Sequence, residues 1–130
     1  MLKDAPIVPY IPATDIARAR EFYEQKVGLV AREEAAGGVV YECGGGSWIF
    51  LYESSGAGTS QASQAFWQVQ DIEREVAELR SRGVVFEEYD RPGALKTVNG
   101  ISEGGGARAA WFKDSEGNIM ALIQSDPAQP

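Results

Sequence analysis

The spacing of apolar residues along the chain changes repeatedly between a period of two, typical of strands, and a spacing of three and four, typical of helices. Helical spacing covers residues 15–28 and again residues 71–83. The apolar stripe of the two predicted helices consists of Ile16, Ala19, Phe22 and Tyr23 in the first, and Ile72, Val76 and Leu79 in the second. An aspartate starts each segment and a glycine, Gly28 or Gly83, ends it, as expected for an N-cap and a left-handed C-terminal residue. Both helices are therefore expected to pack one face on a sheet.

Alternating or β-branched segments flank each helix and predict strands. The predicted strands cover 7–11, 29–33, 39–43 and 48–53 in the first half, and 65–69, 84–89, 107–113 and 119–124 in the second. Glycines at 44–46 and polar residues at 114–118 separate the last two strands of each half and favour chain reversals. The sequence thus predicts two βαβββ copies, over 6–53 and 64–124, joined by a linker over 54–63.

This element order predicts an α+β domain over residues 1–130, in which the two tandem βαβββ modules form a curved mixed sheet around a cavity. A glycine-rich stretch over 91–106 interrupts the second copy. It is interpreted either as a mobile loop that covers a binding site or as a loop that lies free in solvent.

The composition excludes several classes of function. The net charge of -7 argues against nucleic acid or an anionic membrane as a partner, because both bind clustered basic residues. The absence of histidine excludes His-ligated metals and Ser-His or Cys-His mechanisms. Without a long apolar run or a signal-peptide pattern, the protein is expected to be cytoplasmic. The single Cys43 is expected to be an inert buried thiol, since nothing beside it would activate a nucleophile.

The duplication, the segment from Asp15-Ile16 to Phe22-Tyr23 and the turn over 114–118 together resemble the vicinal oxygen chelate superfamily. That superfamily includes glyoxalase I, extradiol dioxygenases, and fosfomycin and bleomycin resistance proteins. The resemblance covers nearly the whole chain, about 7–124. It implies that the two modules surround a shared cavity, which a dimer partner often completes.

The resemblance also implies where a metal would be bound. The positions that match the superfamily's metal ligands, which are usually His, Gln or Glu, are Val8, Phe50, Gln64 and Ala121. Only Gln64 offers an oxygen, and one neutral amide does not hold a divalent ion. No metal and no cofactor are therefore expected. The glutamates near strand ends of the first half, Glu33, Glu34, Glu42 and Glu53, are interpreted as a solvated rim.

The alternation of side chains along strands extends these positions to a cavity face of aromatic and amide residues. The predicted ligand-binding residues are Tyr10, Trp48, Phe50, Tyr52, Gln64, Phe66, Gln68, Arg108 and Phe112. A bulge in the late turn would reverse the direction of Arg108 and Phe112. The aromatic residues could instead be core or contact a partner subunit. The opposite face, expected to be helix-packing core, contains Ile11, Val69, Met120 and Leu122.

Three functions remain open. The first is a metal-independent binding protein of the glyoxalase/bleomycin-resistance type, a homodimer that sequesters a planar or cationic small molecule. The second is a metal-free isomerase or lyase, in which Glu42, Glu53 or Tyr10 moves protons. The third, ranked last, is a metal-dependent glyoxalase-type lyase.

Overall fold

The computed structural model describes residues 1–35, 37–93 and 95–125. Its two α-helices and eight strands are β1 (Tyr10–Ala13), α1 (Ile16–Glu21), β2 (Ala31–Ala35), β3 (Gly38–Glu42), β4 (Trp48–Glu53), β5 (Ser63–Gln68), α2 (Ile72–Ser81), β6 (Ser102–Gly104), β7 (Ala107–Lys113) and β8 (Ile119–Ser125). A π-helical turn over Phe22–Lys26 extends α1, and 3-10 turns lie at Leu2–Asp4 and Gly44–Gly46.

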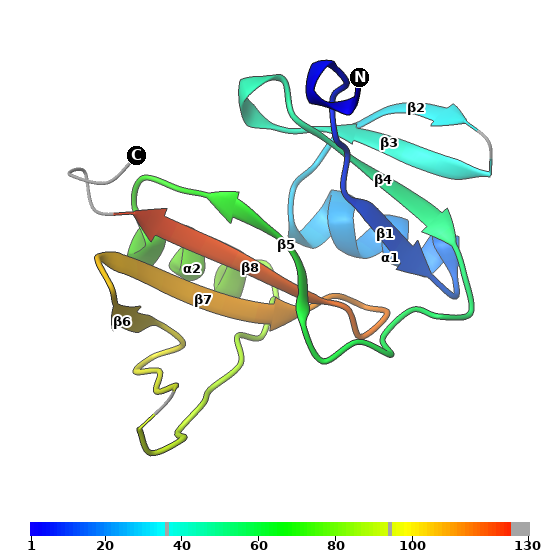
Figure 1. The fold of residues 1–130 in the computed structure, drawn as a ribbon. Helices are drawn as coiled ribbons and strands as arrows, with labels where there is room; N and C mark the ends of the chain where they lie inside the picture. Colours follow the sequence, from blue (N-terminus) through cyan, green and yellow to red (C-terminus); the bar gives the residue numbers. More distant parts are fainter. Residues whose placement is uncertain (36, 94, 126–130) are drawn as a thin grey trace.

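The two halves form four-stranded mixed sheets of identical topology. The strand orders are β1-β4-β3-β2 and β5-β8-β7-β6. In each sheet the first strand runs parallel to the last strand of its half, while the other neighbours are antiparallel. In the view of Figure 1 both helices lie behind the strands, so each sheet has a helix-bearing side and a helix-free side. The predicted α+β class and duplication are confirmed, and the described strands form two open sheets rather than a closed barrel.

Both helices begin and end as their sequence signals predict. The Asp15 carboxylate accepts from the Arg18 N–H, and Asp71 accepts from the Arg74 N–H, each at 3.1 Å. Gly83, at the end of the second helix, has a φ of 96°, which a side chain would strain. The two helices are therefore positioned by local capping before any tertiary contact is considered.

One predicted strand is wrong. The backbone of segment 84–89 pairs with β7 through the isolated Phe86–Phe112 bridge and a 2.8 Å bond from the Glu87 N–H to the Trp111 carbonyl, and not through a ladder. The three-residue strand β6 pairs with the other end of the same β7 edge. Because β6 occupies part of that edge, the 84–89 segment has no room for a full ladder.

The stretch predicted as a loop over 91–106 is largely ordered by local pairing. Bridges join Asp90 to Lys96 and Val98 to Ile101. Its last part forms β6 and the turn into β7. The segment therefore belongs to the outer edge of the second sheet, next to α2.

One hydrophobic core lies on the helix-bearing side of both sheets. The predicted core residues Ile11, Met120 and Leu122 are buried, and Val69 packs against them. The two halves meet here, since the rings of Phe22 and Phe112 lie 6.1 Å apart. The prediction of a helix-packing face is confirmed.

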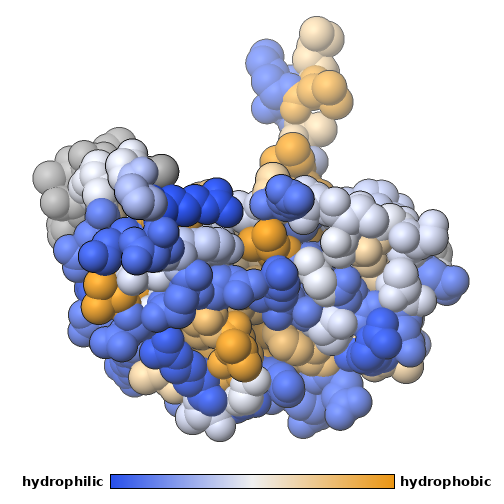
Figure 2. Space-filling model, turned by 90° about the horizontal axis from the view of Figure 1, so that it is seen from below, coloured by the Kyte–Doolittle hydropathy of each residue, from blue (hydrophilic) through white to orange (hydrophobic). Residues whose placement is uncertain are grey.

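The N-terminal segment over residues 1–8 is exposed, and Ile7 is 95% exposed. The face shown in Figure 2 carries apolar patches among mostly hydrophilic residues. Within the described residues, no helix is long and apolar enough to cross a membrane.

Candidate functional site

The helix-free side of the first sheet carries a row of aromatic rings. Tyr10 pairs with Phe50 across the β1–β4 ladder, and Tyr52 follows two residues later on the same face. The Tyr10 ring stacks on Tyr52 at 3.6 Å between centroids, with 20° between the ring planes, and lies 5.5 Å from Phe50. Tyr10 is 59% exposed, so these rings form a surface that a ligand can reach.

A glycine makes room for this row. Gly38 pairs with Tyr52 between β3 and β4. A Cβ atom at Gly38 would collide with the Leu51 carbonyl oxygen and the Phe50 ring. The absence of a side chain at Gly38 therefore leaves the space that the Phe50 ring occupies.

Trp48 extends the row at the start of β4 and pairs with Glu42. The Arg32 guanidinium lies 4.7 Å from the Trp48 ring centroid, and Arg32 also forms a 3.1 Å ion pair with Glu42. Trp48 is 37% exposed, and one face of its ring already contacts a cation. The ring is thus held in place but not covered.

The second sheet repeats this plan with fewer rings. Phe66 and Trp111 both pair with Ala121, and Gln68 pairs with Ile123, so all five lie on the helix-free side. Phe66 is 57% exposed. Sequence reasoning missed Trp111, because the direction of β7 depends on the turn that precedes β8.

For two predicted site residues the expected side of the sheet is wrong because of that turn. Phe112 pairs with Met120 and is completely buried in the helix-side core, where it stacks on Trp67 at 6.2 Å. Arg108 pairs with Gln124 and forms ion pairs with Glu73 and Glu103. The turn over 114–118 places both residues on the side opposite to the one expected.

Gln64 lies at an irregularity of the second sheet. The ladder between β5 and β8 shifts register between Ser63 and Ala65, and Gln64 has no partner in it. Its amide nitrogen donates to the Ala62 carbonyl at 3.5 Å. This irregularity breaks the simple alternation on which its prediction depended.

The most strongly perturbed carboxylate lies at the junction of the two halves. Glu116 lies in the turn between β7 and β8. Its carboxylate accepts hydrogen bonds from Arg18 Nε at 2.7 Å and from the Thr14 and Asp15 backbone N–H groups at 3.0 Å. Its side chain has no exposed surface. These hydrogen bonds, the one from Arg18 first among them, lower the pKa of Glu116 to about 2.

Two neighbours in the same turn complete this junction. The Tyr23 hydroxyl donates to Asp114 at 2.6 Å, and Asn118 donates to Asp114 and to the Pro12 carbonyl at 2.9 and 2.7 Å. Burial, with the negative charge of Asp114, raises the pKa of Tyr23 well above its ordinary value. The sequence indicated this turn only as a reversal and a mark of resemblance. This turn acts as a clamp that joins the two modules, and that role depends on contacts between residues about 100 positions apart in the sequence.

The superfamily model described as glyoxalase/bleomycin resistance protein/dioxygenase matches residues 6–122. The match spans both modules. The chain belongs to this superfamily.

Solved structures share the superfamily fold at low sequence identity. UcmS2 has a TM-score of 0.69 at 16% identity, covering 91% of this chain and 97% of its own. TnmS3, an antibiotic binding protein from Streptomyces sp. CB03234, has a TM-score of 0.62 at 19% identity, covering 95% and 98%. The fosfomycin resistance protein FosX from Listeria monocytogenes has a TM-score of 0.67 at 14% identity, covering 96% of each chain. Comparison with curated proteins found no significant match.

The residues at the superfamily's metal-ligand positions do not fit a metal ion. Val8, Phe50 and Ala121 have hydrocarbon side chains, which leaves Gln64 as the one donor. In the described part of the chain, no three His, Cys, Asp or Glu side chains lie close enough to hold an ion. One neutral amide oxygen does not hold a divalent cation, so these positions do not form a metal site.

The carboxylates considered for acid-base chemistry are poorly placed for it. Glu42 and Glu53 are exposed, and Glu42 is paired with Arg32. A general acid or base near neutrality needs a carboxylate that is buried away from cations. Cys43, expected to be buried, is half-buried at the end of β3.

Proposed function

We propose that this chain is a metal-independent binding protein of the glyoxalase/bleomycin-resistance type, which captures a planar or cationic small molecule on its helix-free aromatic surface. Aromatic rings attract cations through their negative faces and stack on flat rings. The formal charge of -7 favours a positive ligand over a negative one.

The exposure of aromatic rings on both helix-free faces carries the proposal. Tyr10 in the first sheet and Phe66 in the second are both more than half exposed. Each sheet buries its other side in a shared core. Large apolar side chains gathered on one open face are typical of a surface that binds something.

The donor chemistry and one structural neighbour support a binding role without a metal. Three of the four positions where the superfamily binds metal carry only hydrocarbon side chains. TnmS3, which shares the fold, is an antibiotic binding protein. By this proposal the fold of the superfamily is kept, while stacking on aromatic rings takes the place of metal chemistry.

We also propose that the functional unit is a homodimer. An open face gives a small ligand one wall, and tight binding usually needs a site that surrounds most of the ligand. A second copy would supply the other wall. Sedimentation equilibrium should then give twice the monomer mass of 14.1 kDa, whereas a monomer at all concentrations would reject this part of the proposal.

Isothermal titration calorimetry of EDTA-dialysed protein tests the binding function. N-methylacridinium is the planar cation, with tetraethylammonium as a non-planar cation and 9-anthracenecarboxylate as a planar anion. We expect the planar cation to bind most tightly, and Tyr10→Ala or Phe66→Ala to weaken it by about tenfold, which corresponds to roughly 1.4 kcal/mol.

Val85→Ala is the matched control, because it removes an exposed apolar side chain that follows α2. It should leave the affinity unchanged. No heat with any of the three compounds, or binding that requires added Zn²⁺ or Mn²⁺, would reject the proposal.

A further inference from the structure

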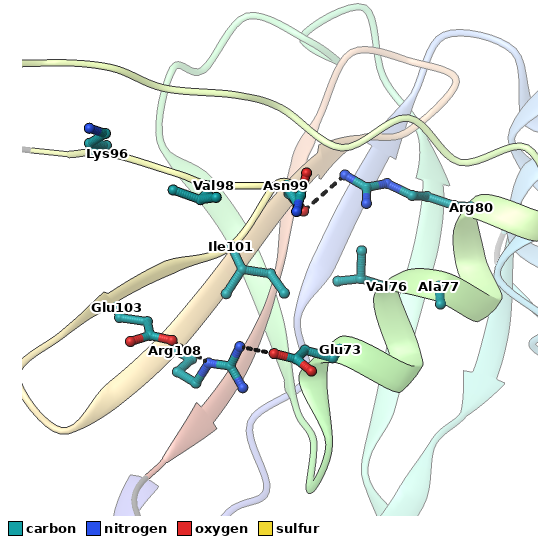
Figure 3. Close-up of a pocket in the computed structure, with 10 residues that line it drawn as sticks. All are labelled: Glu73, Val76, Ala77, Arg80, Lys96, Val98, Asn99, Ile101, Glu103 and Arg108. Carbon is teal, nitrogen blue, oxygen red and sulfur yellow. Dashed lines mark hydrogen bonds and ion pairs between the residues drawn. The ribbon is translucent and has the colours of Figure 1, made fainter.

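A second concave surface lies away from the aromatic faces, between α2 and the β6–β7 edge of the second sheet. Successive turns of α2, from Glu73 to Arg80, form one wall. The segment 96–101 and the β6–β7 hairpin form the other (Figure 3). The open pocket between them has a volume of about 750 Å³, within the range of small-molecule sites. No local pattern indicates it, because its walls come from segments at least 16 residues apart in the chain.

The floor of this α2 pocket is apolar. Val76 and Ala77 from α2 lie opposite Val98 and Ile101, and Figure 3 shows the Val76 and Ile101 side chains pointing into the same space. Val98 is 65% exposed and Ile101 is half-buried, whereas Val76 is 2% exposed and belongs to the core beneath them. This floor can hold the hydrocarbon part of a ligand.

Charged side chains form the rim, and they differ between its two ends. At one end Arg108 is paired with both Glu73 and Glu103, at 2.6 and 3.1 Å. On the opposite side Arg80 Nη2 donates to the neutral Asn99 carbonyl at 3.0 Å, and Lys96 lies farther along the same wall, beyond Val98 (Figure 3). Counting three cations against two carboxylates, the pocket carries one net positive charge in a chain whose total is -7.

The wall that carries Asn99 is preformed. Asn99 and Gly100 both have left-handed backbone, with φ of 54° and 81°, as a tight hairpin turn requires. A Cβ atom at Gly100 would lie 2.9 Å from Arg80 Nη2, so glycine lets this turn approach the arginine closely. Glu88 accepts from the Gly100 N–H and from Thr97 Oγ1. Little ordering is therefore needed when a ligand binds.

We propose that the α2 pocket is a second small-molecule site, which takes a compound with an apolar body and a single carboxylate. The hydrocarbon part lies over Val98 and Ile101, and the carboxylate lies beside Arg80, on the side of the pocket that Lys96 also lines. This site is independent of the aromatic surface and prefers the opposite charge.

NMR titration of ¹⁵N-labelled protein tests the charge preference with three compounds of equal chain length: hexanoate, hexanol and hexylammonium. Hexanoate should shift the amides of 76–80 and 96–101 with a Kd on the order of 1 mM, as expected for so small a ligand. Hexylammonium should bind at least about tenfold more weakly, and hexanol should lie between them. Shifts of equal size with all three compounds would overturn the carboxylate assignment, and no saturable shift with hexanoate would overturn the site.

Two variants locate the binding, each with a matched control. Ala77→Trp fills the pocket from an exposed position of α2 and should abolish the hexanoate shifts at 96–101, whereas Ala17→Trp on the exposed face of α1 should not. Lys96→Glu should weaken hexanoate by about three- to tenfold, and Lys3→Glu, with the same change of net charge, should have no effect. Hexanoate binding that survives Ala77→Trp would contradict the proposal.

Discussion

Both sides of the sheets carry aromatic side chains, but those on one side are buried and those on the other are exposed. On the helix-bearing side Phe112 and Trp67 stack within a closed core, and Phe112 has no exposed surface. On the helix-free side Tyr10 and Phe66 are more than half exposed. Neighbouring positions of the same strands therefore provide stability on one side and a reachable surface on the other, which is the basis of the proposed function.

The largest contrast is expected from shortening one aromatic residue on each side. Phe112→Ala should reduce the free energy of unfolding by about 3–5 kcal/mol, because it leaves a cavity in the core. Phe66→Ala should cost less than about 1 kcal/mol, because its ring is mostly in solvent. Urea denaturation measures both, and equal losses would mean that Phe66 belongs to the core.

The clamp at Glu116 should make the helix-bearing side sensitive to acid. Its pKa, about 2 in the folded chain, lies below the ordinary value of 4.5, so its stabilisation is complete above pH 4.5 and is lost as the pH falls toward 2. A shift of this size corresponds to at most about 3 kcal/mol. Glu116→Gln should therefore destabilise the protein by about 1–3 kcal/mol at pH 7 and flatten the pH dependence of stability between 4.5 and 2.

A neutral counterpart at the second helix provides the control for Glu116. The Gln124 side-chain oxygen accepts from the Ile72 N–H at 2.8 Å, at the start of α2. Gln124→Ala should cost about 1 kcal/mol and leave the acid dependence unchanged. An unchanged acid profile in Glu116→Gln would show that another group sets it.

The smallest expected difference separates two glycines of the first half. Gly38→Ala places a Cβ against Leu51 and Phe50, and should cost about 1–3 kcal/mol. Gly44→Ala meets no atom within 4 Å and should change stability by less than about 0.5 kcal/mol. Thermal denaturation of the two variants compares them directly, and a tolerated Gly38→Ala would mean that the Phe50 ring is free to move.

Local signals account for what the sequence predicted correctly. The caps at Asp15 and Asp71, the apolar stripes and the duplicated order of elements depend on residues close in the chain, and each agrees with the structure. Tyr10 and Phe50 were placed on one face because strand alternation is regular there.

The features that the sequence did not predict depend on how segments are placed relative to one another in the fold. The side to which Arg108 and Phe112 point depends on the residue count of the 114–118 turn, and one position more or less reverses every side chain of β7. The missing strand over 84–89 depends on which segment reaches the β7 edge. The α2 pocket likewise arises from segments brought together only by the fold.

The three tryptophans test the central claim most directly, because the fold divides them between the two sides. Trp48 and Trp111 lie on the helix-free side, whereas Trp67 pairs with Leu122 on the helix-bearing side. In NMR spectra of EDTA-dialysed protein, N-methylacridinium should shift the indole N–H signals of Trp48 and Trp111 and leave that of Trp67 unchanged. A shift confined to Trp67, or no saturable shift at any of the three, would contradict binding at the aromatic surface.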